Sequence, residues 1–319
     1  MYTVGIDLGG TNIAIGLCDE KFNIIDKDST PTGAQRPAEK IVDDMAALTD
    51  KIIRRNGLTP EEISGVGIAT PGSVDDKTGR VLYSNNIPFT NLPLAKLFKE
   101  RLAVKRVVLL NDADAAALGE TLAGAARGAK CAVMITLGTG IGGGIVIDGK
   151  VHTGTNNAAG ELGHTVISIG GRQCTCGRRG CFEAYASATA LSAITEEKMR
   201  ELKYLGIDSE LFRQVNREGR ATARTAFDAM RAGDRYGKQV VDEYITYLAE
   251  GVTNMINIFQ PDVLIIGGGI CNERENLTRP LTSLVELWQY TRDNDKKTRI
   301  VTAELGNDAG IVGAAGAVE

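Results

Sequence analysis

The amino-acid sequence predicts an α/β protein of two lobes, with central mixed sheets and a metal-pinned loop. Three observations support this: apolar runs alternate with helical patterns along all 319 residues, glycine clusters directly follow three of these runs, and three cysteines crowd into eight residues. The order of strands, glycine turn and helices occurs twice. We therefore expect a small lobe from residues 1–115 with the C-terminal helix 306–319, a large lobe from residues 116–305, and a hinge near residues 113–120.

Composition and charge disfavour several classes of partner. The hydrophobic content of 43 % and the charged content of 24 % are typical of globular proteins, and the net charge of −4 comes with no basic stripe. We therefore expect neither nucleic acid nor an anionic membrane as the main partner. No apolar run approaches the roughly 20 residues that span a bilayer, and the N-terminus lacks the pattern of a signal peptide. The scattered Cys18, Cys131 and Cys271 favour a reducing, cytoplasmic location.

The first half shows clear strand and helix patterns. Ala38–Arg55 carries apolar residues at helical spacing and stops before Gly57, and Thr59 begins a capping box with proline at the first helical position. The expected elements are, in order, strands at residues 3–6, 13–17 and 22–25, a helix at Ala38–Arg55, a strand at 66–69, a helix at 92–102, a strand at 107–110 and an alanine-rich helix from 113 to about 126.

The second half repeats the pattern. Asp148-Gly149 between two apolar runs is the signal of a tight hairpin, and Pro261 ends a long helical stretch. The expected elements are a strand at 132–136, a glycine turn at 138–144, hairpin strands at 145–147 and 150–152, a mostly helical segment at 188–259, a strand at 263–266 and a small-residue helix at 310–318.

The first glycine turn (residues 7–12) directly follows a strand. Gly9 and Gly10 free the backbone to turn sharply and to aim N–H groups at an anion, while Thr11 and Asn12 add side-chain donors. Asp7, at the strand tip, can hold Mg²⁺ directly or through water. A tight hairpin turn explains the same residues, so this motif alone does not decide between the two interpretations.

The second glycine turn (residues 138–144) begins with Gly138, Thr139 and Gly140 and matches a loose G-x-G-x-x-G pattern. A hairpin rather than a helix follows it, and no acidic strand end lies about 20 residues further on, so a dinucleotide-binding fold is disfavoured. The lysine pattern of a P-loop is absent from the sequence as well.

The third glycine turn consists of Gly267, Gly268 and Gly269, whose bare backbone lets a planar adenine lie against the chain. Alone it fits a strand-to-helix turn equally well. Three such turns in this order resemble the ASKHA superfamily of actin-like ATPases and sugar kinases, over residues 5–316. That resemblance implies a ribonuclease-H-like sheet in both lobes, with ATP in the cleft between them.

A cluster of His164, Cys174, Cys176 and Cys181 has the composition of a zinc site. Three thiolates and one imidazole complete a tetrahedral set, and the two glycines between the last two cysteines let the chain fold back. A disulfide with one free thiol is the alternative. Four protein ligands leave no open position for a substrate, so we expect Zn²⁺ to be structural.

Residues 161–164, the cysteine cluster and residues 183–187 together resemble the ROK family (repressors, open reading frames, kinases). The resemblance implies that Asn111, Asp112, Glu161, His164 and Glu183 bind the sugar. It also implies that His164 places one ring nitrogen on zinc and the other on a sugar hydroxyl. The implied activity is an ATP-dependent hexose kinase, most specifically a glucokinase that phosphorylates the 6-hydroxyl of glucose, in a homodimer or tetramer.

Asp112 is the candidate catalytic base. It follows a strand end, where side chains reach a binding site, and a carboxylate can accept the proton of a sugar hydroxyl as the bond to phosphorus forms. The alternative is an N-cap for the helix from Ala113, and Asp114 is the rival acid, better explained as a first-turn residue. Gly72 and Asn86, the latter in the loop 85–88, resemble weaker family sugar contacts, although turn chemistry also explains them.

Other functions share these motifs. Kinases of fructose, mannose, allose or N-acetylmannosamine are alternatives, but Ser73 stands where enzymes for N-acetylated sugars often carry arginine, which favours a plain hexose. Sugar-sensing ROK repressors carry a helix-turn-helix domain before the first glycine turn, and the turn here begins at Asp7, so we expect no such domain. A catalytically silent sugar-binding protein is disfavoured by Asp112 and the three intact turns.

Overall fold

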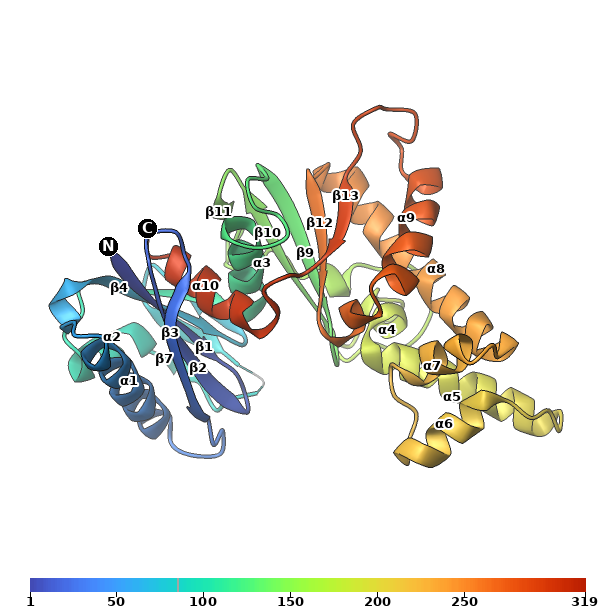
Figure 1. The fold of residues 1–319 in the computed structure, drawn as a ribbon, viewed down its shortest axis with the longest axis horizontal. Helices are drawn as coiled ribbons and strands as arrows, with labels where there is room; N and C mark the ends of the chain where they lie inside the picture. Colours follow the sequence, from blue (N-terminus) through green and yellow to red (C-terminus); the bar gives the residue numbers. More distant parts are fainter. Residues whose placement is uncertain (85) are drawn as a thin grey trace. The chain divides into compact units, whose positions relative to one another are not determined.

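The computed structural model describes residues 1–84 and 86–319, so Asn85 of the loop 85–88 lies outside the described residues (Figure 1). The chain forms two compact units. Unit 1 consists of Met1–Met134, Gly144–Gly160 and Ala303–Glu319, and unit 2 consists of Ile135–Gly143 and Glu161–Thr302. The lobe boundary near residue 115 that the sequence suggested stays a prediction.

A mixed sheet forms the centre of unit 1. Its strands are β1 (Tyr2–Leu8), β2 (Asn12–Cys18), β3 (Ile24–Pro31), β4 (Ile63–Thr70) and β8 (Val107–Asn111), in the order β3-β2-β1-β4-β8. β4 pairs in parallel with both β1 and β8, whereas β2 and β3 are antiparallel. The carboxyl ends of β1, β4 and β8 therefore meet at one edge, which is where the candidate residues of unit 1 lie.

Two helices cover one face of this sheet. α1 (Ala38–Arg55) has its expected bounds, and it packs with α2 (Leu94–Arg101) over the buried β1 residues Val4, Ile6 and Leu8. α2 begins two residues later than expected because Pro93 occupies its N-cap position. β3 also begins later than expected, since Phe22 adopts a left-handed backbone with φ of 62°.

Three short strands were not expected from the sequence: β5 (Ser73–Asp75), β6 (Arg80–Tyr83) and β7 (Thr90–Leu92). They form a small antiparallel sheet in the order β5-β6-β7. At three or four residues each, they are too short to show a clear period of two. This sheet holds the segment that contains Gly72.

α10 (Ala309–Gly316) packs closely against the opposite face of the unit 1 sheet, and α3 (Asp112–Leu122) packs against α10. A side-chain carbon at Gly67 would lie 1.7 Å from the Ala314 carbonyl oxygen, and one at Gly5 would meet α10 at 1.9 Å. Glycine is therefore required there for the helix to approach the strands. The expected C-terminal helix at 310–318 is confirmed with slightly earlier bounds.

The second sheet has the order β11-β10-β9-β12-β13. Its strands are β9 (Cys131–Leu137), β10 (Ile141–Ile147), β11 (Lys150–Val151), β12 (Val263–Gly267) and β13 (Arg299–Thr302). The expected hairpin between β10 and β11 is confirmed. The expected second glycine turn at 138–144 was too long, since residues 141–144 pair within β10 and only residues 138–140 form the turn.

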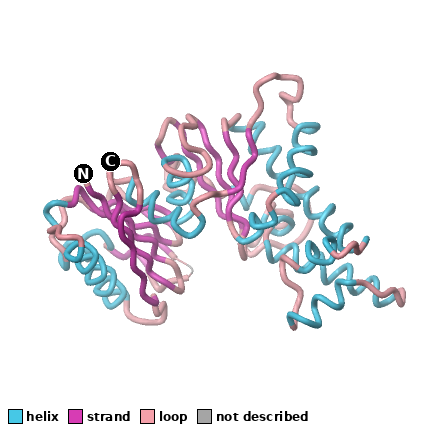
Figure 2. Tube along the Cα trace, in the orientation of Figure 1, coloured by secondary structure: helices cyan, strands magenta, loops and turns pink. Residues whose placement is uncertain are grey.

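The predicted helical character of residues 188–259 is confirmed (Figure 2). The short α4 (Glu183–Ala186) precedes this segment, which contains α5 (Ala188–Tyr204), α6 (Glu210–Glu218), α7 (Thr225–Arg231) and α8 (Arg235–Phe259). A further helix, α9 (Glu275–Trp288), was not expected from the sequence. Among the described helices, none combines the length and apolar composition that crossing a membrane requires.

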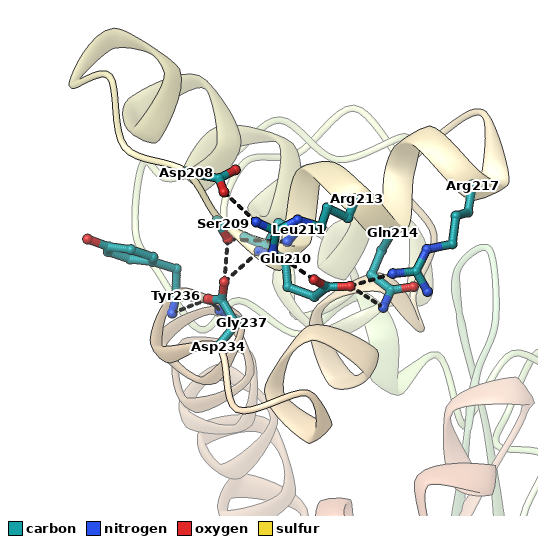
Figure 3. A network of polar contacts seen from close by, with 10 residues as sticks. All are labelled: Asp208, Ser209, Glu210, Leu211, Arg213, Gln214, Arg217, Asp234, Tyr236 and Gly237. Carbon is teal, nitrogen blue, oxygen red and sulfur yellow. Dashed lines mark hydrogen bonds and ion pairs between the residues drawn. The ribbon is translucent and has the colours of Figure 1, made fainter.

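Asp234 joins two helices of this segment (Figure 3). Its carboxylate caps α8 by accepting from the N–H groups of Tyr236 and Gly237, at 2.6 and 2.9 Å. It also accepts from the Ser209 hydroxyl and the Glu210 N–H at the start of α6, at 2.8 and 2.6 Å. Burial alone would raise the pKa of Asp234, but these hydrogen bonds outweigh it and hold the pKa below its ordinary value.

Candidate active site

The carboxyl edge of the unit 1 sheet gathers polar residues from three parallel strands. Asp7, the next-to-last residue of β1, pairs with Ala69 of β4, and Thr70 of β4 pairs with Asn111 of β8. Asp112 follows directly as the first residue of α3. The strand register therefore brings together Asp7, Asn111 and Asp112, which are distant in sequence.

The first glycine turn joins β1 to β2 at this edge. The Gly9 N–H donates to the Asn12 carbonyl at 2.9 Å, and Thr32 supports the turn from β3's side. The Thr32 hydroxyl donates to the Gly9 carbonyl at 2.7 Å, and the Thr32 N–H donates to the Thr11 carbonyl at 2.8 Å. Thr32 was missed from the sequence because no local motif marks it.

The structure also brings the two weaker sugar-site candidates to this edge. A side-chain carbon at Gly10 would lie 3.4 Å from the Asn86 Cβ, so the first glycine turn borders Asn86. Gly72 has φ of 97°, and a side-chain carbon there would lie 2.0 Å from the Tyr83 carbonyl oxygen. Only glycine fits this position.

Asn111, rather than Asp112, is the N-cap of α3. Its side-chain oxygen accepts from the N–H groups of Ala113 and Asp114, at 2.8 and 3.4 Å. Its amide nitrogen donates to the Gly72 carbonyl at 2.9 Å. The side chain of Asn111 thus holds the Gly72 loop against the helix start, and the capping function considered for Asp112 belongs mainly to its neighbour.

Asp7 and Asp112 form a pair of interacting carboxyl groups. Burial, and secondly the negative charge of Asp112, raise the pKa of Asp7 to about 6. Asp112 is an exposed residue, yet the surrounding protein atoms raise the pKa of its carboxyl above the ordinary value. Hydrogen bonds, including one from the Ala113 N–H at 2.9 Å, oppose that rise. Two unneutralised carboxyls are an arrangement that a divalent cation would stabilise.

The second glycine turn in unit 2 is held by α5. The Ala188 N–H donates to the Gly138 carbonyl at 2.9 Å, and the Thr189 hydroxyl donates to the Thr139 carbonyl at 2.8 Å. Both carbonyls are therefore engaged by the first residues of a helix. A helix N-terminus close to a glycine turn favours binding of an anion.

The third glycine turn lies beside the second. Gly268 has φ of 82°, and a side-chain carbon there would lie 2.4 Å from the carbonyl oxygen of Leu137, the last residue of β9. Unit 2 thus brings the second and third glycine turns together at the ends of the neighbouring strands β9 and β12. Gly269 has open space around its Cα, which fits the close approach of a flat ligand.

The ligand atoms of His164, Cys174, Cys176 and Cys181 all lie within 4.8 Å of one another. The Cys174 Sγ is 3.6 Å from the His164 Nδ1, and the Cys176 Sγ is 3.6 Å from the Cys181 Sγ. Zinc–sulfur bonds of about 2.3 Å in a tetrahedron place ligand atoms roughly 3.5–3.8 Å apart. The cluster therefore has the composition and the spacing of a closed zinc site, and its three thiols and one imidazole come from one short segment.

Glu161 and Glu183 approach this cluster from two sides. The Glu161 carboxylate lies 3.9 Å from the His164 Nε2, the ring nitrogen opposite the cysteines. Glu183 accepts from the Ile141 N–H at 2.9 Å and from the Thr175 hydroxyl at 3.1 Å. Both oxygens of Glu183 thus have protein partners, which the sequence-based assignment to sugar binding did not foresee.

Two broad hollows in the surface of unit 1 lie away from these residues. One, of about 520 Å³, borders the β5–β6 turn and α2, and the other, of about 540 Å³, lies between α1 and the segment after α2. No candidate site residue lines either hollow. The candidate site residues therefore lie at the strand ends and glycine turns, outside these two hollows.

The two sheets, with glycine turns at their strand ends, form an actin-like ATPase fold. A family model described as "ROK family" matches residues 3–319, and the chain belongs to this family.

Named relatives agree with this placement. A glucokinase of Halalkalibacterium halodurans is 37 % identical over 98 % of this chain and 93 % of its own length. A glucokinase of Thermotoga maritima is 38 % identical over 99 % of this chain and 96 % of its own. Among solved structures, a ROK family glucokinase from Streptomyces griseus in complex with glucose and AMPPNP is 32 % identical, with a TM-score of 0.78 over 99 % of this chain and 98 % of that one.

Proposed function

We propose that this chain is an ATP-dependent hexose kinase that transfers the γ-phosphoryl group of ATP to the 6-hydroxyl of glucose. The observation that carries the proposal is the position of Asp112 at the strand edge beside Asp7 and the first glycine turn, in a chain whose relatives are named glucokinases. A carboxylate next to a phosphate-binding turn is the combination that phosphoryl transfer to an alcohol requires.

Asp112 serves as the general base. In its ionised form it accepts the proton of the sugar hydroxyl as that oxygen forms a bond to the γ-phosphorus and the bond to the leaving ADP oxygen breaks. Partial desolvation by the surrounding protein atoms raises the pKa of Asp112, which makes its carboxylate a stronger base than a fully hydrated aspartate. The Ala113 N–H holds one carboxylate oxygen in place.

The glycine turns bind the nucleotide in this proposal. Backbone N–H groups of the first and second turns would hold phosphate oxygens, and the third would lie against the adenine. Mg²⁺, for which the unneutralised pair of Asp7 and Asp112 is a fitting environment, would supply charge neutralisation to the phosphates. Asp7 is the residue that would hold this ion.

Polar side chains of the candidate site hold the sugar in this proposal. Glu161 and the His164 Nε2 lie 3.9 Å apart and present an acceptor and a ring nitrogen to sugar hydroxyls. Asn111 has one amide hydrogen left for the sugar after its bond to Gly72. The Cys₃His cluster fits structural Zn²⁺, which would fix the ring of His164 and the loop that carries it.

The decisive experiment is Asp112→Asn, tested with a coupled assay of ADP release. We expect turnover to fall by about 10²–10⁴-fold with glucose affinity changed little, because asparagine keeps the shape and loses the basic oxygen. Asp293→Asn, at a side chain that is 94 % exposed, is the matched control and should keep parental turnover. Near-normal turnover of Asp112→Asn would remove Asp112 as the base.

The same assay, run over a panel of hexoses and N-acetylhexosamines, tests the preferred sugar. Ser73 after Gly72 supports a plain hexose, and a higher kcat/KM for N-acetylmannosamine, fructose, mannose or allose would replace glucose in the proposal. Replacing ATP by polyphosphate or ADP tests the donor. A sugar-sensing regulator would bind the sugar without releasing ADP.

Location and assembly complete the proposal. Three scattered cysteines together with a Cys₃His cluster are the cysteine usage of a reducing compartment, and this supports a cytoplasmic location. A homodimer or tetramer is the assembly that the family resemblance implies, and sedimentation velocity measures it.

A further inference from the structure

The second glycine turn and the metal-binding loop (residues 164–181) meet at one side chain. Glu183, the first residue of α4, directs its Oε2 to the Ile141 N–H at 2.9 Å, just after the turn. Its Oε1 lies 3.1 Å from the Thr175 hydroxyl and 3.6 Å from the Cys174 Sγ. One carboxylate therefore contacts both segments.

The turn is shaped to admit this carboxylate. A side-chain carbon at Gly140 would lie 2.2 Å from the Glu183 Oε2, so any residue other than glycine would displace it. Gly163, just before the metal-binding loop, is also restricted to glycine. A side-chain carbon there would lie 2.4 Å from the Ile141 carbonyl oxygen. Two glycines thus let the turn, the carboxylate and the loop pack at hydrogen-bond distance.

We propose that Glu183 is a positioning residue that couples the metal-binding loop to the second glycine turn, so that metal occupancy and nucleotide binding strengthen each other. This inference rests on the proposed function. With the metal bound, Cys174 and Thr175 are fixed, Thr175 orients the carboxylate, and the carboxylate fixes the Ile141 N–H at the end of the turn. Without the metal, the Thr175 hydroxyl that donates to the Oε1 is released and the turn loses one support.

Linkage makes the coupling measurable in both directions. If the metal tightens nucleotide binding by some factor, the nucleotide must tighten metal binding by the same factor. A net hydrogen-bond contribution of the usual size corresponds to about 3–10-fold. The experiment measures Zn²⁺ affinity by equilibrium competition with a chelator of known affinity, with and without AMP-PNP, in the absence of sugar.

We expect AMP-PNP to tighten Zn²⁺ binding to the parent protein by about 3–10-fold, and Glu183→Ala to abolish this effect. Thr175→Val removes only the hydroxyl that joins the loop to Glu183, and it should also reduce the effect strongly. Thr175→Ser keeps the hydroxyl and is the matched control, which should behave as the parent does. Neither threonine variant changes a metal ligand.

Two outcomes separate the inference from the function on which it rests. If the parent binds AMP-PNP and turns over glucose but AMP-PNP leaves Zn²⁺ affinity unchanged, the coupling is wrong and the kinase proposal stands. The coupling is also wrong if Thr175→Val and Thr175→Ser show the same effect of AMP-PNP. If calorimetry finds no binding of AMP-PNP to the parent, the proposed function fails together with the coupling.

Discussion

The first and second glycine turns are alike in sequence but are held in place by different kinds of interaction. The first is attached to a sheet whose residues Val4, Ile6 and Leu8 are fully buried, and the opposite face is packed against α10 through glycines. The second is held by hydrogen bonds to the starts of α4 and α5, and through Glu183 it meets the metal-binding loop.

This difference shows that close apolar packing and a polar, metal-pinned frame can hold the same kind of turn. Packing is insensitive to metal and responds to changes in volume. A polar frame responds to the loss of a ligand or of one hydrogen-bond partner. Each prediction below therefore changes either the surroundings of the first turn or the polar, metal-dependent contacts of the second turn.

The largest effect is expected for Gly67→Val, in the packing between α10 and the sheet that carries the first turn. Its side chain would overlap the Ala314 carbonyl, 1.7 Å from an added carbon, and should cost more than about 3 kcal/mol of the free energy of unfolding. Denaturant unfolding measures this cost. Ala47→Val, on the exposed side of α1, is the control and should cost under about 1 kcal/mol. Equal stabilities of the two variants would refute the close packing of α10.

An intermediate effect is expected for Cys176→Ser, in the metal-binding loop that supports the second turn. Cys176 is exposed, so serine disturbs little packing, and the loss of stability reports the missing metal ligand. We expect metal content to fall well below one ion per chain and the thermal midpoint to drop by about 5–10 °C. Metal analysis and calorimetry measure both. A variant free of zinc with parental stability and activity would contradict a structural metal.

The smallest effect on stability is expected for Asp7→Asn at the first turn. The pKa of Asp7 is raised from 3.8 to about 6, so its charged form costs stability that is absent below pH 4, sets in between pH 4 and 6, and is complete above pH 6. Asparagine carries no charge, so the variant should melt about 2–4 °C higher than the parent at pH 7.5 and equally below pH 4.

The same substitution should lower activity, because it removes the proposed magnesium ligand. In the parent, kcat/KM should therefore fall as the pH drops through about 6 and Asp7 becomes protonated. A pH–rate profile measures this fall. A variant that is less stable than the parent at pH 7.5 would mean that the Asp7 charge is favourable in the folded protein.

Much of the fold could be predicted because its signals are local. Ala38–Arg55 was predicted to the residue, since its apolar spacing and the glycine that follows lie within one window. β5, β6 and β7 could not be predicted, because strands of three or four residues are too short to show a clear periodicity. The length of the second glycine turn was wrong because glycines within β10 look the same in sequence as glycines in a turn.

The candidate site could be predicted as a set of residues but not as a set of contacts. Asp7, Asp112 and the cysteine cluster stand out because each lies in a short motif. The contact of Glu183 with the Ile141 N–H joins positions 42 residues apart, and the contacts of the Glu120 carboxylate with the backbone at Glu304 and Leu305 join positions more distant still. Such pairs carry no local sequence signal, so only the folded chain shows them.

The placement of α10 has a consequence for synthesis on the ribosome. The β1 and β4 glycines are covered by a helix that is synthesised only after Ile135–Gly143 and Glu161–Thr302 have been made. At ordinary elongation rates the interval between Gly67 and α10 is about 12–50 s, during which the sheet face at Gly5 and Gly67 lacks its covering helix. The nascent chain therefore has a defined interval in which a chaperone that binds apolar β-surfaces can act on it.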